Sequence, residues 1–230
     1  MRFKTVRVSR THREGTKQAD AILRAARKVF IKDGPSGFSA RRVADAAALS
    51  LGSVQHVFPT VDALLVAMLE YVISDYERQY EALARGLPFT SEARLSAIID
   101  YLIDDVFKQD TRCFFFGFWE LSCHNKLVSR LFTEAYAYHA DTLAASIAAV
   151  RPDCDEAACL AIARQVAALI EGWMVFTTRG LESAEGKLRR ELLRNGVDTL
   201  IRNSKGQTQS DAPDSRQTRR GARASGRSAP

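Results

Sequence analysis

The sequence predicts an all-α fold with two parts, a small three-helix unit near the N-terminus and a larger helical bundle after it. Apolar residues recur at helical spacing through most of residues 17–203, and the alternation typical of strands is nearly absent. Ser or Thr precedes three of the expected helices, where its hydroxyl can cap the first turn. Gly and Pro interrupt the apolar pattern at two places, which marks helix ends.

The N-terminal unit is expected to hold three helices. The first runs from Lys17 to Asp33, and Gly34 and Pro35 end it, because Gly serves as a C-cap and Pro cannot continue a helix. Ser39 is placed to cap the second helix and Ser50 the third. We therefore place the first domain at residues 17–60.

A long helix, expected from Val61 to about Leu83 and capped by Thr60, leads into the larger part. Gly86, Leu87 and Pro88 then break the pattern. We place the second domain at residues 61–203. The further helices are expected at about 91–108, 114–124, 126–150, 156–179 and 183–202.

The composition is that of an ordinary globular protein. The chain has 230 residues, of which 46% are hydrophobic and 26% charged. No run reaches the roughly 18 uncharged apolar residues of a membrane span, and the N-terminus has no apolar core of signal-peptide length. We therefore expect a cytoplasmic protein with no membrane partner.

The net charge of +6 is concentrated at the two ends of the chain. Residues 1–16 contain five Lys or Arg and one Glu, and residues 204–230 contain six Lys or Arg and two Asp. We interpret the first segment as a flexible basic arm and the second as a disordered basic tail, because the latter lacks large apolar side chains. Both suit salt-sensitive contact with an anionic polymer, although solubility alone would also explain the tail.

The four cysteines predict neither zinc nor a disulfide. Cys113, Cys123, Cys154 and Cys159 form no CxxC pattern and have no paired histidine spacing. We expect reduced thiols, no metal and no cofactor.

The segment FSARRVADAAALSLGSVQHVF, from Phe38 to Phe58, has the pattern of a helix-turn-helix motif. Ala44 is small where the two short helices cross, and Val43 and Val54 supply apolar contacts. The polar side chains of the second helix are left facing outward, as in a helix that enters a DNA major groove. The candidate DNA-contacting residues are Ser39, Arg41, Arg42, Ser50, Leu51, Gly52, Ser53, Gln55, His56 and Thr60.

This segment resembles the TetR family of repressors, in which the region usually follows TxxxIAxxAGVSxGTxYxHF.SKExLL. The resemblance covers roughly residues 17–69. It implies a C-terminal domain that binds a small-molecule effector and forms a homodimer, whose two recognition helices require a near-palindromic operator. The residues in register are Val43, Ala44, Ala46, Ala47, Ser50, Gly52, His56, Phe58, Leu64 and Leu65.

Three departures from the family pattern bear on affinity and base preference. Ala48 replaces the turn glycine, so that a positive φ there would cost about 1 kcal/mol. Leu51 and Val61 stand where Lys is frequent, and Gln55 and Val57 replace aromatic residues. The basic arm is a candidate to supply DNA contacts in place of those that these substitutions remove.

The stretch from Phe114 to Trp119 is apolar all round, so we expect it inside the second domain. Aromatic side chains between bundle helices are typical of a small-molecule pocket, although plain core is the alternative. The FWEL stretch is similar to BetI-like members of the family. Glu120, His124 and Tyr101 are the expected polar anchors. The candidate effector-contacting residues are Tyr101, Phe115, Phe118, Trp119, Glu120, His124, Trp173 and Phe176.

The last two helices are the expected dimer interface, in a four-helix arrangement between two subunits. One apolar stripe belongs to the helix at 156–179 and the other to the helix at 183–202. The stripes consist of Ile162, Val166, Leu169, Ile170 and Trp173, and of Leu188, Leu192, Leu193, Val197, Leu200 and Ile201.

Together these expectations describe a repressor that an effector releases from double-stranded DNA by shifting the helix at 61–83. No catalytic residue is assigned. Two other classes remain open: an all-helical enzyme or carrier in which Glu120 and His124 act and the N-terminal motif is only structural, and an interaction protein whose basic tails contact nucleic acid without sequence preference. Glu120 and His124, four residues apart, are interpreted as a hydrogen-bonded pair, and Asp100 and Asp104 as solvated.

Overall fold

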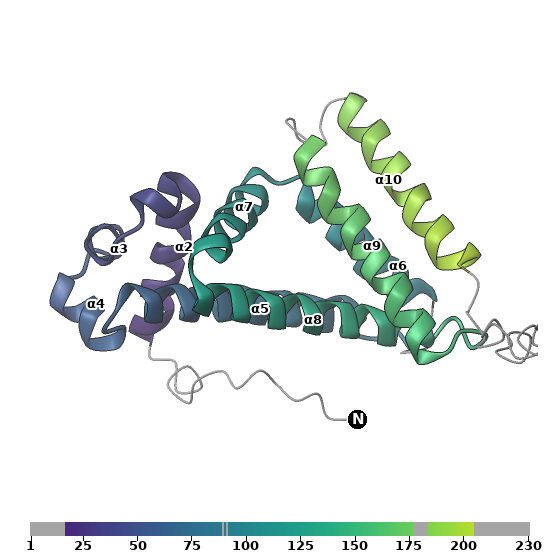
Figure 1. Ribbon diagram of the computed structural model, residues 1–230, viewed down its shortest axis with the longest axis horizontal. Coiled ribbons are helices and arrows are strands. Elements are labelled where there is room, and N and C mark those ends of the chain that lie inside the picture. Colours follow the sequence, from purple (N-terminus) through teal and green to yellow (C-terminus); the bar gives the residue numbers. More distant parts are fainter. Residues whose placement is uncertain (1–16, 89, 91, 177–183, 205–230) are drawn as a thin grey trace, which may run out of the picture.

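The computed structural model describes residues 17–88, 90, 92–176 and 184–204, and all regular structure within them is helical, as the sequence predicts. In Figure 1, α2, α3 and α4 lie together at one end, α5 and α8 run side by side along the molecule, and α10 lies outermost beside α9. The helices are α2 (Lys17–Gly37), α3 (Ala40–Ala47), α4 (Leu51–Val57), α5 (Val61–Ala84), α6 (Glu92–Val106), α7 (Gln109–His124), α8 (Lys126–Ala148), α9 (Glu156–Phe176) and α10 (Ala184–Asn203).

Most helix boundaries lie within a few residues of the prediction. The exception is α7, which begins at Gln109 rather than at Phe114. Its first turn is polar, so the apolar period that reveals the rest of the helix is missing there. The predicted arm at residues 1–16, the tail at 205–230 and the end of the helix predicted at 156–179 lie outside the described residues.

The three predicted N-caps are confirmed. The side-chain oxygens of Ser39, Ser50 and Thr60 each accept a hydrogen bond from the backbone N–H three residues later, at 3.3, 3.1 and 3.0 Å. Each cap satisfies an amide that the first helical turn leaves without a partner. The starts of α3, α4 and α5 are therefore fixed by local chemistry.

The regular part of α2 is broken at Gly34, next to the predicted end at Asp33, although the helix as a whole runs to Gly37. Gly34 has φ of 68°, which breaks the regular part of α2, and Pro35 follows it. The chain then turns so that Phe38 packs edge-on against Phe30, with their ring centroids 5.5 Å apart. This bend sets the direction in which α3 leaves α2.

The turn between α3 and α4 carries backbone strain. Ala48 adopts the left-handed conformation, with φ of 54°, at the position where the motif that it resembles usually has glycine. Its N–H donates to Asp45 O at 3.2 Å, and Leu49 N–H donates to Ala44 O at 2.9 Å. This is the hydrogen-bond pattern of a Schellman cap. The turn keeps this geometry without glycine, and the β-carbon of Ala48 makes the left-handed conformation energetically unfavourable.

The buried side chains form two clusters that divide the helices differently from the predicted boundary at residue 60. The first cluster joins α2, α3 and α4 to the first half of α5, to α7 and to the start of α8. The second joins α6, α8, α9 and α10. The first includes Ile22, Phe30, Val54, Leu64, Met68, Phe114 and Phe118, and the second includes Ile99, Ile103, Ile147, Val166, Ile170, Leu193 and Val197.

Ion pairs attach α10 to α6, contrary to the expectation that Asp100 and Asp104 are solvated. Arg190 donates to Asp104 at 2.5 Å and to Asp100 at 3.1 Å, and Arg194 lies 2.8 Å from Asp100. The two acids are four residues apart on α6, and the two arginines are four apart on α10. The matched spacing lets both pairs form across one helix contact.

By length and composition, α9 is the one described helix that could cross a membrane. Arg164 and Glu171 interrupt its apolar residues, and it packs against α6, α8 and α10. The core helix of a helical bundle has the same composition.

Replacing Ala48 with glycine tests the strain in the turn. We expect Ala48→Gly to raise the free energy of unfolding by about 0.5–1 kcal/mol, because it removes the left-handed penalty and costs only backbone entropy. The control is Ala46→Gly, two residues earlier and helical, which should lower it by about 1 kcal/mol. Denaturant unfolding measures both, and destabilisation by both changes would contradict the account.

Candidate DNA interface and effector cavity

The ten predicted DNA-contacting residues all lie in α3, α4 and the residues that precede these helices and α5, at the end of the molecule shown at the left of Figure 1. Gln55 and His56 are exposed on α4, and Val54 between them and the core is fully buried. Gly52 is exposed, whereas Leu51 is half-buried. The outward face of α4 is therefore polar, as the motif predicts.

Several of these residues also have roles within the fold. Ser39, Ser50 and Thr60 are the N-caps, and the Ser53 hydroxyl lies 2.8 Å from that of Ser50. Capping leaves the hydroxyl hydrogens of Ser39 and Thr60 available for another acceptor, such as a phosphate oxygen, whereas one of the Ser50 and Ser53 hydroxyls donates to the other.

The two arginines of α3 differ in their surroundings. Arg42 forms an ion pair with Asp33 of α2 at 2.9 Å, and more than half of its side chain stays exposed. Arg41 is exposed as well. The ion pair holds Arg42 toward α2, which restricts where its guanidinium can lie.

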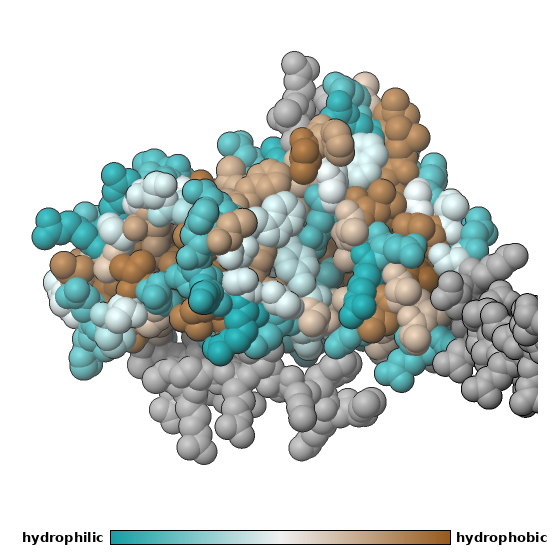
Figure 2. Space-filling model, in the orientation of Figure 1, coloured by the Kyte–Doolittle hydropathy of each residue, from teal (hydrophilic) through white to brown (hydrophobic). Residues whose placement is uncertain are grey.

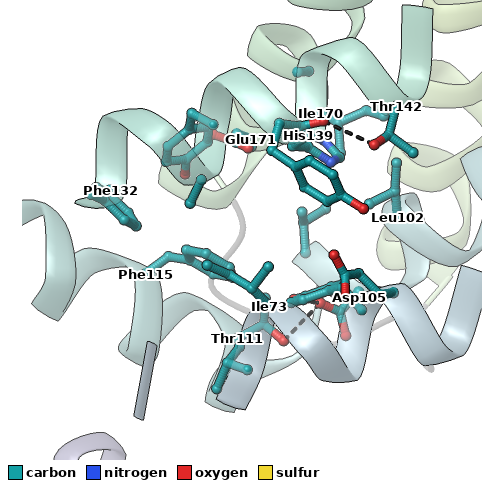
Figure 3. Close-up of a pocket in the computed structure, with 18 of the residues that line it drawn as sticks. Ile73, Leu102, Asp105, Thr111, Phe115, Phe132, His139, Thr142, Ile170 and Glu171 are labelled. Atoms are coloured by element: carbon teal, nitrogen blue, oxygen red, sulfur yellow. Dashed lines mark hydrogen bonds between the residues drawn. The ribbon is translucent and has the colours of Figure 1, made fainter. Parts of the chain in front are cut away.

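A cavity of about 100 Å³ lies among α5, α6, α7, α8 and α9. Its walls are mostly aromatic and aliphatic. Figure 3 shows Asp105 and Thr111 on one side of the space and His139 and Glu171 on the other, with Phe115 and Phe132 at one end. The aromatic rings that line it are Tyr76, Tyr80, Phe115, Phe132, Tyr136 and Tyr138.

Asp105 is the polar centre of one wall. Tyr76 donates a hydrogen bond to its Oδ2 at 2.5 Å, Thr111 donates to the same oxygen at 3.2 Å, and Lys108 lies 3.0 Å from Oδ1. Burial, followed by the nearby Asp105 carboxylate, raises the pKa of Tyr76 above its ordinary value. Tyr76 therefore stays a neutral donor, and Lys108 balances the charge of Asp105.

Glu171 is the polar centre of the opposite wall. Burial raises the pKa of Glu171 to about 7, and a hydrogen bond from Tyr136 opposes part of that rise. Trp119 Nε1 donates to the Tyr136 hydroxyl at 3.2 Å. Burial lowers the pKa of His139 to about 4, so the imidazole is neutral near pH 7. This wall thus carries a carboxylate that titrates near neutrality and no positive charge from His139.

Of the predicted effector-contacting residues, only Phe115 lines this cavity. Phe118 is fully buried on another face of α7, against Phe30. Trp119 acts one step away, through its hydrogen bond to Tyr136. Phe118 and Trp119 therefore do not line this cavity, because successive residues of a helix point in different directions.

The other five predicted residues lie away from the cavity walls. Glu120 and His124 are exposed, because α7 turns its buried faces toward α2 and α8. They are therefore not anchors inside the cavity. Tyr101 packs edge-on against two other tyrosines. Trp173 packs against the second cluster, and Phe176, at the end of α9, is 72% exposed.

Asp105, His139 and Glu171 were not predicted from the sequence as cavity residues. A signal was present, since each interrupts an apolar stripe of its helix. Asp105 stands between Leu102 and Val106, and Glu171 follows Ile170. A charged residue at a core position of a helix has either a partner or a ligand.

Helix α7 connects this cavity to the N-terminal helices. Thr111 and Phe115 face the cavity, whereas Phe114 and Phe118 pack on Phe30 of α2, with ring centroids 5.7 and 4.9 Å away. Gly117 lies so close that an added β-carbon would be 2.7 Å from Phe30 Cε1. The two helices touch without a gap. A movement of α7 at the cavity would therefore displace α2.

One face of α7 differs from the prediction that the aromatic stretch is wholly inside. Phe116 is 38% exposed, and its ring packs beside Trp119 at 5.4 Å. It points away from both α2 and the cavity.

The predicted dimer stripes are largely internal. Ile162, Val166 and Ile170 of α9 are buried in the chain's own second cluster, as are Leu193 and Val197 of α10. They hold α9 and α10 onto α6 and α8.

Part of the predicted α10 stripe, together with apolar side chains at the end of α9, is left uncovered. Leu188 and Leu192 of α10 are 56% and 54% exposed, and Val175 and Phe176 of α9 are more exposed still. Figure 2 shows apolar side chains gathered over α9 and α10. An exposed apolar patch of this kind marks an interaction surface.

Two family models match the chain. Residues 22–68 match the N-terminal model of the bacterial regulatory proteins of the tetR family, and residues 91–202 match the C-terminal model of the BetI-type transcriptional repressor. The chain belongs to the TetR family, and it is a DNA-binding transcriptional regulator rather than an enzyme. Among curated protein sequences, none matches it.

Solved structures share the fold at low sequence identity. A transcriptional regulator from Pseudomonas aeruginosa PAO1 is 19% identical, with a TM-score of 0.66 over 84% of this chain and 94% of that one. A regulator from Saccharomonospora viridis in complex with choline is 17% identical, with a TM-score of 0.63 over 78% and 94%. The multidrug binding protein EbrR, complexed with imidazole, is 20% identical, with a TM-score of 0.53 over 79% and 95%.

Enlarging Gly117 tests the contact between α7 and α2. We expect Gly117→Ala to lower the free energy of unfolding by about 1–3 kcal/mol, because the methyl group overlaps the Phe30 ring. Adding Phe30→Leu to Gly117→Ala should recover part of the loss. Denaturant unfolding of both single variants and the pair measures the coupling, and simple additivity would contradict the contact.

Proposed function

We propose that the protein is a homodimeric repressor that binds a near-palindromic operator and is released from it by a small organic cation. The observation that carries this proposal is a cavity with aromatic walls and a half-buried carboxylate, Glu171, joined by α7 to the DNA-binding helices.

The DNA-binding role of the particular residues is supported by the exposed polar face of α4. Gln55 can pair with an adenine edge in the major groove, and His56 lies beside it. Arg41 and Arg42 flank this face on α3 and suit phosphate contacts. The hydroxyls of Ser39, Ser50, Ser53 and Thr60, with Leu51 and Gly52, complete the proposed surface.

The charge of the effector is supported by the chemistry of the cavity. Tyr and Phe rings attract a cation through their faces. Glu171 gains a counter-ion when a cation binds, which offsets the cost of its burial. The choline complex of the Saccharomonospora viridis neighbour agrees with this class of ligand.

The route of release is supported by the two faces of α7. A cation bound beside Phe115 and Thr111 favours one position of α7. Because Phe118 of α7 packs on Phe30, the position of α2 changes with that of α7. The first half of α5 packs in the same cluster, so a shift of α5 would accompany the change. The effector can act only through different affinities for the two arrangements.

The dimer interface is supported by the exposed apolar surface of α9 and α10, which keeps Leu188 and Leu192 of the expected stripes and leaves out their buried members. Leu188 and Leu192 lie one turn apart on α10, and Ala168, Gly172 and Val175 are exposed along α9. A twofold axis through this surface would bury it against its own copy.

Alanine substitutions on the outward face test the DNA interface. We expect Gln55→Ala and His56→Ala to weaken operator binding by about 1–3 kcal/mol and relax base preference, and Arg42→Ala to lower the salt dependence by about one phosphate contact. Fluorescence anisotropy with a duplex selected from a random pool measures this. Lys187→Ala, on α10, is the matched control for lost charge. Unchanged affinity and preference in all three variants would refute the proposed surface.

Charged substitutions on α10 test the dimer. Leu188→Glu and Leu192→Glu should each shift the protein toward monomer, because a carboxylate would be buried in the interface. Analytical ultracentrifugation measures the mass. The control is Leu127→Glu, a change of the same kind at an exposed leucine of α8. A wild-type monomer, or dimers that persist in both α10 variants, would contradict the proposal.

The pH dependence of cation binding tests the role of Glu171. Because its pKa is about 7, the carboxylate loses its charge as the pH falls from about 8 to 6, and we expect tetramethylammonium to bind more weakly at the lower pH. Glu171→Gln should bind weakly and without this pH dependence. Calorimetry measures both, with sodium chloride matching ionic strength. Bound tetramethylammonium should also release the operator duplex, and retention of the duplex would contradict release.

A further inference from the structure

A second chamber lies outside the first, between α5 and α8 and bordered by α6. Its volume is about 390 Å³, larger than that of the inner cavity. Three carboxylates of α5, Glu70, Glu77 and Glu81, and the guanidinium of Arg94 are the charged groups that line it. Glu81 is exposed, so this chamber reaches the surface of the molecule.

The two chambers share part of their walls. Glu77, Tyr80 and Tyr138 line both of them, together with Leu69, Ile73 and Thr142. A hydrogen bond joins the Tyr138 hydroxyl to Glu77 at this boundary. Because one set of side chains forms the partition, a long molecule that displaces Tyr138 or Glu77 slightly can occupy both spaces.

The carboxylates of the outer chamber lie on one face of α5, since residues seven and eleven positions apart project in similar directions. Glu70 and Glu77 are half-buried, and burial raises the pKa of Glu70. Three acids face one arginine, so negative charge is in excess. Partly buried carboxylates of one sign favour a cation in the space between them.

The inner chamber has a separate acidic group at its far wall. Asp105 is balanced by Lys108, and Glu77 lies at the boundary with the outer chamber. Glu171 is thus the carboxylate of the far wall that a cation in the inner chamber can neutralise. A ligand with one positive charge that binds beside Glu171 leaves the outer glutamates without a counter-ion.

We propose that the two chambers form one elongated site for an organic molecule with two positive charges. One cationic group lies among the aromatic rings beside Glu171, an apolar linker passes between Tyr80 and Tyr138, and the second cationic group lies among Glu70, Glu77 and Glu81. This inference rests on the proposed function, from which it takes the cationic class of the effector.

Calorimetry on the full-length protein tests the inference with two pairs of matched probes. Hexamethonium and decamethonium carry a trimethylammonium group at each end, and hexyltrimethylammonium and decyltrimethylammonium carry one on the same alkyl chain. We expect at least one bis-cation to bind about tenfold or more tightly than its matched monocation, because the second group binds within the same site. This advantage should shrink at high salt.

Two variants locate the second cationic group. Glu70→Gln combined with Glu81→Gln should remove most of the advantage of the bis-cation while leaving the affinity of the monocation unchanged. Glu120→Gln, an exposed glutamate of α7, is the control and should leave both affinities unchanged.

The outcomes separate this inference from the proposed function. Equal affinities within each matched pair, or an advantage that survives in the double glutamine variant, would overturn the two-charge site while the cation effector stands. Failure of all four probes to bind would overturn both.

Discussion

The packing of Phe30 against α7 is the contact on which the rest of the molecule depends. Gly117 lets the backbone of α7 approach the Phe30 ring, and Phe114 and Phe118 close around it. The same helix presents Phe115 and Thr111 to the cavity. Interiors packed at this density transmit displacement rather than absorb it. The DNA-binding helices and the cavity thus lie against different faces of α7.

The cavity keeps a carboxylate where an apolar side chain would give a more stable core. Burial raises the pKa of Glu171 to about 7, which is the energetic signature of a charge held away from water. Tyr136, fixed in turn by Trp119, partly compensates. A group held at this cost is typical of a functional site. The ion pairs between α6 and α10, in contrast, only join helices.

Local chemistry made the N-terminal part predictable. The caps at Ser39 and Ser50, the glycine bend at Gly34 and the apolar spacing of the short helices depend on near neighbours in the chain, and the structure has all of them. The cavity was less predictable, because its walls come from five helices whose rotations the sequence does not state. Phe118 and Phe115 illustrate this. The helical period predicts that both are buried, but it does not predict which part of the molecule each one contacts. The dimer stripes are only partly exposed for a similar reason, since burial within one chain and burial between two chains give the same sequence pattern.

The distance between the two DNA-binding units of the proposed dimer tests the central claim most directly. Spin labels at Ala46→Cys, in protein whose exposed Cys123 is replaced by serine, report that distance by electron double resonance. We expect tetramethylammonium to change the distance distribution, and we expect Phe118→Leu, which loosens the contact with Phe30, to reduce that change strongly. An equal change with and without the Phe118 ring would show that the signal does not pass through α7, and would contradict the account.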